Sequence, residues 1–160
     1  MTILGIDPGT AIVGYAVVAK NERTGDPILI DAGSIQPEAR EQGERLKSVR
    51  KHLLQLLDIH SPNIIALEKI FFSKNIRTAL AVAEARGVFL LTAAERSIKV
   101  CEYTPGEVKM AVTGYGKADK RQVKDMARLI LKQAALPALD DITDAIAIAL
   151  TALQANKDGK

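Results

Sequence analysis

The sequence lacks disulfide partners, long apolar runs and a strong excess of one charge. Its single cysteine, Cys101, cannot form an internal disulfide, and we expect it to be a small core residue of an apolar strand. No apolar run approaches the roughly 18 residues of a membrane span, and the N-terminus lacks the regions of a signal peptide. The sequence therefore predicts a soluble, cytoplasmic protein without a membrane partner. Its net charge of +3 is too small to indicate a nucleic-acid partner by itself.

What the chain does contain is enough apolar sequence for a packed core. Hydrophobic residues make up 48% of the 160 positions and charged residues 26%, which is typical of a globular protein rather than a disordered one. There is no internal repeat and no interdomain linker. We expect one domain over residues 1–155, followed by a short flexible tail at residues 156–160.

Strand and helix patterns predict an α/β fold. Three short apolar segments joined by a turn and a polar loop indicate an antiparallel meander, and later strand and helix segments alternate. A strand-helix-strand unit favours a parallel crossover, so the sheet should be mixed, with five strands flanked by helices. The predicted strands cover residues 2–7, 12–19, 28–35, 64–68 and 98–102, and the predicted helices cover 38–59, 76–97, 105–112, 119–133 and 140–155.

Four acidic residues adjoin the apolar segments. Asp7 and Glu68 each end a strand-like run, and Asp141 and Asp144 precede the apolar part of the last helix. If the first and fourth strands are neighbours, Asp7 and Glu68 approach each other, while residues at i and i+3 share one helix face. Carboxylates that converge repel one another and need a cation. Mg²⁺ prefers oxygen ligands of this kind, so the pattern predicts a magnesium site.

The expected chemistry is hydrolysis of a phosphodiester. A cage of four carboxylates could hold two Mg²⁺ ions about 4 Å apart, or Mn²⁺ in their place. We expect Asp7 to bridge both ions, one of which would activate water while the other stabilises the leaving 3′ oxygen.

Each of these residues also has an ordinary structural explanation. Asp7 precedes Pro8-Gly9 and suits a turn. Glu68 could pair with a nearby lysine, and Asp144 could be an acid of the protein surface. Taken separately, none of the residues decides the question.

Asp140 competes with Asp141 for the metal. Asp140 lies four residues before Asp144, so it is also one helical turn away, and spacing cannot choose between the two. Asp140 directly follows the break at residues 136–139 and suits the helix N-cap better. We therefore expect Asp141 to bind the metal.

A basic segment lies between the predicted strands and the last helix. Residues 104–132 contain seven lysines and arginines against three acidic residues, an excess larger than the net charge of the whole chain. Positive charge beside an acidic metal site indicates a polyanionic substrate.

Five sequence blocks resemble, in order along nearly the whole chain, those of the RuvC family of Holliday-junction resolvases. An ordered set of blocks is far more specific than any one motif. The blocks are Ile3 to Thr10 with Gly14-Tyr15, Ala66 to Phe71 with Lys74-Asn75, Ala85-Arg86-Gly87, Glu107 to Val123, and Asp141 to Ala149.

The resemblance implies a ribonuclease H-like fold and a homodimer that makes Mg²⁺-dependent nicks in two opposed strands of a four-way DNA junction. The nicks would leave 5′-phosphate and 3′-hydroxyl ends, in recombination and repair, in cooperation with a branch-migration motor. By position in the motifs, the catalytic metal ligands are Asp7, Glu68, Asp141 and Asp144.

The resemblance also implies a set of DNA contacts. Phe71 matches an aromatic position that can stack on an unpaired base near the crossover, a contact worth roughly 1–3 kcal/mol. The alternative for Phe71 is ordinary core packing, and for the lysines a solvated helix face. The expected basic contacts are Lys74, Lys109, Lys117, Lys120 and Arg121.

Three other functions are less consistent with the sequence. Residues 5–10 resemble the first phosphate loop of the actin and sugar-kinase class of ATP-binding proteins, but the chain has no second copy of that loop. A different ribonuclease H-like nuclease would share the early Asp-x-Gly pattern, although the Phe71 loop and the final pair of aspartates favour the resolvase. A catalytically silent DNA-binding module would gain nothing from four carboxylates, because negative charge near phosphates weakens binding.

Overall fold

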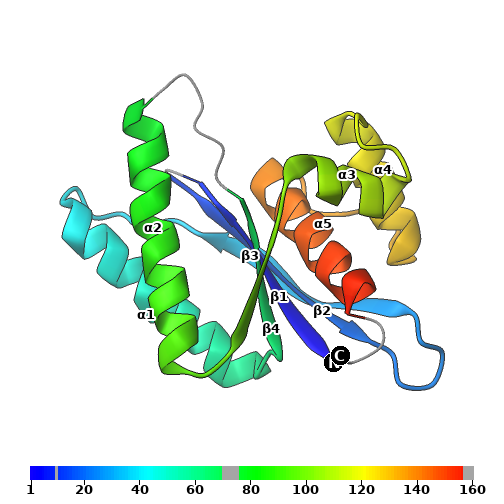
Figure 1. Cartoon of the computed structure of the whole chain (residues 1–160), viewed down its shortest axis with the longest axis horizontal. Coiled ribbons are helices and arrows are strands. Elements are labelled where there is room, and N and C mark those ends of the chain that lie inside the picture. The colour runs from blue at the N-terminus through cyan, green and yellow to red at the C-terminus, as the bar shows by residue number, and fades with distance from the viewer. Residues whose placement is uncertain (10, 70–75, 157–160) are drawn as a thin grey trace.

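The computed structural model describes residues 1–9, 11–69 and 76–156 (Figure 1). Five strands and five helices are described in this part of the chain. The strands are β1 (Thr2–Pro8), β2 (Val13–Lys20), β3 (Pro27–Ile35), β4 (Ile64–Glu68) and β5 (Lys99–Tyr103). The helices are α1 (Gln42–His60), α2 (Ile76–Glu95), α3 (Pro105–Thr113), α4 (Lys120–Ile130) and α5 (Asp140–Ala155).

The strands form one mixed sheet in the order β3-β2-β1-β4-β5. The first three strands pair antiparallel, and β4 and β5 extend the sheet in parallel from β1. The predicted meander, the parallel crossover and the pairing of the first strand with the fourth are therefore confirmed. Because parallel neighbours end at the same edge of a sheet, the carboxyl ends of β1 and β4 lie together.

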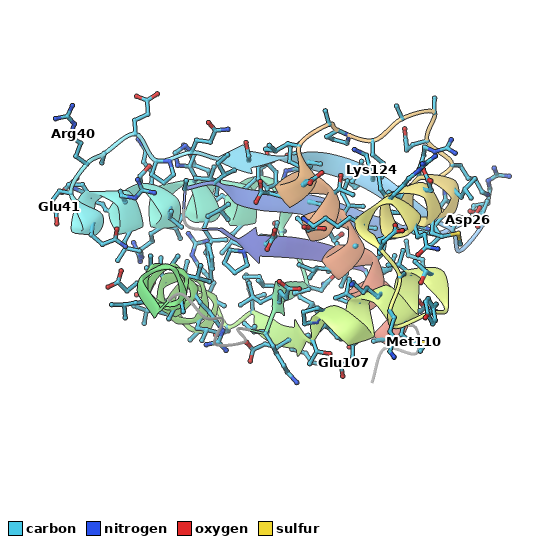
Figure 2. All side chains as sticks on the ribbon, turned by 90° about the horizontal axis from the view of Figure 1, so that it is seen from above. Asp26, Arg40, Glu41, Glu107, Met110 and Lys124 are labelled. Carbon is cyan, nitrogen blue, oxygen red and sulfur yellow. The ribbon has the colours of Figure 1, made fainter. Side chains whose placement is uncertain are left out.

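Helices cover both faces of the sheet, as Figure 1 shows. Alternate residues of a strand point to opposite faces. On β1, Ile3 packs in the core beneath α3, α4 and α5, whereas Leu4 and Ile6 pack in the core beneath α1 and α2. In the view from above, α1 and α2 lie on one side of the molecule and the other three helices on the other (Figure 2).

Helix α1 begins four residues later than the sequence predicted. The expected start was Glu38, but the first helical residue is Gln42 and the N-cap is Glu41. The Glu41 carboxylate accepts hydrogen bonds from the backbone N–H groups of Gly43 and Glu44, at 2.9 Å each. Those amides have no partner inside the helix, so a side chain that satisfies them fixes the first turn.

The two helices of the basic segment begin as the sequence predicted. Asp119 caps α4, and Gln122 returns a bond to the Asp119 backbone N–H, which completes a capping box. Thr104 and Glu107 form the same arrangement at the start of α3. Within the described ranges, no helix is long and apolar enough to cross a membrane.

Candidate active site

Asp7 and Glu68 project from adjacent strands onto the same face of the sheet. Ile6 of β1 is paired with Leu67 of β4, so the two acidic residues follow a matched pair. Ile3 and Ile64 pack in the core beneath α5, and each lies four positions before the acid on its own strand, so the two share a face. Both carboxylates therefore point toward α5, and both residues are half-buried.

Two glycines allow α5 to approach the sheet closely enough to complete the site. A side chain at Gly5 would meet the backbone N of Ala149 at 2.8 Å. A side chain at Gly14 would lie against the Asp141 carbonyl, far inside contact distance, and 3.0 Å from the backbone N of Ile142. The backbone of α5 thus rests directly on β1 and β2. This contact sets the distance between Asp7 and the first turns of α5, which carry the acidic residues.

The close approach places like charges together. The pKa of Asp7 is raised from 3.8 to about 7, first by burial and then by the charges of Asp144, Glu68 and Asp141. Burial and the charge of Asp144 also raise the pKa of Glu68. A carboxyl group in such a position is stabilised by either a proton or a cation.

Two lysines face the acidic residues. Lys120, the first residue of α4, has its Nζ 3.2 Å from Asp144 Oδ2, and this hydrogen bond is the main cause that raises the pKa of Lys120. The charges of Lys120 and, to a smaller extent, Lys109 of α3 partly offset the rise in the pKa of Glu68. Asp7, Glu68, Asp144 and both lysines line one pocket of about 340 Å³. We call it the acidic pocket.

Asp140 is not the N-cap that the sequence predicted. The N-cap of α5 is Leu139, which makes no side-chain capping bond, and Asp140 is the first helical residue. Its side chain is 68% exposed and lies 3.8 Å from Lys120 Nζ. The helix begins one residue earlier than an N-cap at Asp140 would require. Asp141 is nevertheless among the charges that raise the pKa of Asp7, whereas Asp140 acts on Lys120.

The predicted DNA contacts divide into three groups. Lys109 and Lys120 line the acidic pocket. Lys117 and Arg121 are exposed at the start of α4, where Arg121 Nε lies 3.8 Å from Asp125 Oδ2. Phe71 and Lys74 lie outside the described residues. The sequence predicted the charged groups of the pocket but gave no structural role to Gly5 and Gly14. The signal that could have indicated their role is that both glycines lie opposite α5, a helix with many small residues.

The donor set suits a divalent cation in charge and chemistry, because it consists of carboxylates that repel one another. The described residues nevertheless contain no group of three or more His, Cys, Asp or Glu side chains that could hold a metal ion as they lie. The carboxylates of the acidic pocket therefore do not converge on a single point in this structure.

The sheet order, together with carboxylates at the ends of β1 and β4 beneath an acidic helix, defines a ribonuclease H-like nuclease. The family model for crossover junction endodeoxyribonuclease RuvC matches residues 3–152. The chain belongs to the RuvC family, as the sequence blocks indicated.

Relatives and solved structures agree with this assignment. A crossover junction endodeoxyribonuclease RuvC from Halothermothrix orenii is 44% identical over 152 residues, covering 94% of this chain and 90% of the relative. The Thermus thermophilus RuvC structure is 33% identical with a TM-score of 0.88, covering 98% of this chain and 96% of that one. T. thermophilus RuvC in complex with Holliday junction substrate is 31% identical with a TM-score of 0.87, covering 99% and 97%.

Proposed function

We propose that this chain resolves four-way DNA junctions by metal-dependent hydrolysis of phosphodiester bonds. One observation carries the proposal: Asp7, Glu68 and Asp144 meet Lys109 and Lys120 in one pocket. Acidic groups that hold a cation beside basic groups that hold a phosphate are what phosphodiester hydrolysis requires. Membership of the family, and the relative solved with a Holliday junction, support the junction as the substrate.

The carboxylates are the proposed metal ligands: Asp7, Glu68, Asp144 and Asp141. Mg²⁺ or Mn²⁺, with two ions at the site, would supply an activated water and Lewis-acid stabilisation of the leaving oxygen. The pKa of about 7 at Asp7 means that its proton is easily lost near neutral pH, which frees an oxygen ligand in a half-buried place.

The lysines are the proposed phosphate contacts. Hydrogen bonding to Asp144 raises the pKa of Lys120, so its ammonium group stays charged at neutral pH. Together with Lys109, which lines the same pocket, Lys120 would offset the negative charge of a phosphate that enters among carboxylates. Lys117, Arg121, Lys74 and Phe71 are proposed to bind DNA further from the cleaved bond.

Cleavage of a synthetic junction tests this function. The purified chain is incubated with a four-way junction or a linear duplex of the same sequence, in Mg²⁺ or in EDTA. We expect paired nicks with 5′-phosphate and 3′-hydroxyl ends in the junction alone, and only with metal. Asp7→Asn should bind the junction without cutting it. Cutting by Asp7→Asn, or no cutting by the unaltered chain with any divalent metal, would contradict the proposal.

We also propose that the active form is a homodimer joined through α2. Leu80 and Leu91 are 61% and 58% exposed on this helix, and Ala83, Gly87 and Ala94 are exposed at helical spacing between and beyond them. A stripe of this kind suits a second copy of the chain, because a junction with two-fold symmetry needs two equivalent sites. Cooperation with a branch-migration motor remains a prediction from the family alone.

The oligomeric state tests the dimer. Leu91→Glu should shift the chain from dimer to monomer in sedimentation equilibrium and turn paired nicks into single ones. Leu129→Glu is a matched control, because Leu129 is also 58% exposed but lies on α4. A chain that is monomeric before substitution, at concentrations where it makes paired nicks, would contradict the α2 interface.

A further inference from the structure

A second pocket lies outside the acidic pocket, between the turn that follows α3 and the outer side of α4. Its volume is about 330 Å³. None of its residues belongs to the proposed metal ligands or phosphate contacts. We call it the Tyr115 pocket, and it is lined by Thr113, Tyr115, Ala118, Gln122, Asp125 and Met126.

The backbone holds Tyr115 firmly while the side chain stays exposed. The Tyr115 N–H donates to Thr113 Oγ1 at 3.1 Å, and its carbonyl accepts from the Ala118 N–H at 3.0 Å. The preceding residue, Gly114, ends α3 with a φ of 76°. The Tyr115 side chain is nevertheless 57% exposed. A ring displayed from a fixed turn loses little conformational entropy when it binds a partner.

The chemistry of the walls suits a flat heterocycle. Tyr115 supplies an aromatic face, and Met126 supplies a polarisable thioether that makes favourable contacts with rings. Gln122 uses its Oε1 to accept from the Asp119 N–H at 2.9 Å, so its amide nitrogen can donate to a ligand. Asp125 is an acceptor. A donor and an acceptor three residues apart on one helix, in a pocket that also has an aromatic ring and a thioether, match the hydrogen-bonding edge and the faces of a nucleobase.

The charges around the pocket suit the backbone of the same ligand. Lys117 and Arg121 are exposed and directly precede the lining residues Ala118 and Gln122 in the sequence. Lys124 lies on the same helix, α4 (Figure 2). Helix α4 also carries Lys120 into the acidic pocket. Met126 lies six positions after Lys120, about 9 Å along the helix axis. That span equals roughly two to three nucleotides of one strand at 3.4 Å each.

We propose that the Tyr115 pocket binds an unpaired nucleobase of the DNA strand held at the acidic pocket. This assignment rests on the proposed function. The base stacks on Tyr115 against Met126, while Gln122 and Asp125 contact its edge. Such a contact selects DNA whose bases are free to leave the duplex, as at a branch point, over continuous duplex.

Binding to junctions that lack single bases tests the assignment. The affinity of the full chain for a labelled junction is measured in EDTA, so that the DNA stays intact, with an abasic nucleotide moved one position at a time past the nick site. We expect one position at which loss of the base weakens binding about tenfold. Tyr115→Ala should weaken binding of the intact junction to a similar degree and lose sensitivity at that position. Tyr115→Phe should keep both properties.

Leu129→Ala is the matched control, because Leu129 is a similarly exposed apolar residue of α4 that does not line the pocket. The assignment is wrong if Tyr115→Ala binds as Leu129→Ala does while the unaltered chain cuts junctions. It is also wrong if Tyr115→Ala weakens binding but keeps the full abasic profile, because Tyr115 would then contact the DNA without holding the base at that position. Failure of the unaltered chain to bind or cut any junction would overturn the proposed function itself.

Discussion

On the face of the sheet covered by α1 and α2, opposite charges meet, whereas on the face covered by α5 like charges meet. Arg50 pairs with Glu95 at 2.6 Å, and Arg96 pairs with Asp58 at 2.7 Å, so two ion pairs join α1 to α2. Beneath α5, burial and then the charges of three other carboxylates raise the pKa of Asp7, and the charge of Lys120 partly offsets that rise. The ion pairs of the first face need no ligand, whereas the crowded carboxylates of the second face are stabilised by a proton or a cation.

The two faces also differ in how their helices touch the strands. Large side chains such as Leu53 of α1 and Phe89 of α2 separate those helices from the sheet and fill the core between them. Gly5 and Gly14 let the backbone of α5 rest directly on the strands. A close approach leaves no room for adjustment, which is useful where carboxylates must be held at fixed positions.

The largest expected contrast comes from making one substitution on each face. Asp144→Asn should reduce junction cleavage at least about 10³-fold, because losing a proposed metal ligand would remove roughly 4 kcal/mol of transition-state stabilisation. Asp58→Asn, on the α1 face, should leave the cleavage rate within about twofold, since surface substitutions of this kind have small effects. Single-turnover cleavage of a labelled junction measures both.

Asp140→Asn tests whether Asp140 or Asp141 of α5 serves the metal site. Asp140 is exposed and contacts only Lys120 among the described acidic-pocket residues, so its loss should change the rate less than about tenfold. A loss as large as that of Asp144→Asn would show that the metal ligands were assigned wrongly.

Adding one methyl group to each face should change stability in opposite directions. Gly14→Ala forces a side chain against the Asp141 carbonyl and should cost about 2 kcal/mol or more of unfolding free energy. Gly87→Ala lies mid-helix in α2 with nothing within 4 Å of the new group, and should gain about 0.5–1 kcal/mol. Urea unfolding at concentrations below dimer formation measures both. A Gly14→Ala variant as stable as the unaltered chain would contradict the close approach of α5 to β2.

The sequence predicted the order of strands and helices better than it predicted how closely each helix packs on the sheet. Apolar runs and turns were enough for the strand order near β1, because a strand-helix-strand unit leaves few choices. The position of α5 depended on Gly5 and Gly14, residues without a side chain, whose function appears only when their neighbours across the sheet are known. The cap of α5 was misassigned because Asp140 has the chemistry of an N-cap, yet Leu139 holds that position without a side-chain bond.

The pH dependence of stability should also differ between the faces. A raised carboxyl pKa means that the folded state binds the proton more tightly, so stability falls as pH rises from 3.8 to about 7. Asp7→Asn should therefore stabilise the metal-free chain by roughly 1–3 kcal/mol at pH 8, less than the full shift would give because the site can relax. Below about pH 4 this stabilisation by Asp7→Asn should vanish, because Asp7 is then protonated in both the folded and the unfolded state.

For Glu41, the N-cap of α1, stability should depend on pH in the opposite direction. Hydrogen bonds from the backbone N–H groups of Gly43 and Glu44 lower its pKa, so its contribution is present above pH 4.5 and is lost as pH falls. Urea unfolding of Asp7→Asn and Glu41→Gln across pH 3–8 separates the two. A gain for Asp7→Asn that does not depend on pH would show that repulsion among carboxylates is not its source.

The smallest expected effect concerns the ion pairs that distinguish the α1 face. Arg96 and Asp58 are 42% and 60% exposed, so solvent screens their attraction. Breaking the pair should cost only about 0.2–1 kcal/mol, and less in 1 M salt. A double-mutant cycle of Arg96→Ala and Asp58→Ala, measured by urea unfolding at low and high salt, isolates this coupling. A coupling above about 2 kcal/mol that persists in salt would mean that these pairs, rather than Leu53, Phe89 and the core around them, hold α2 against α1.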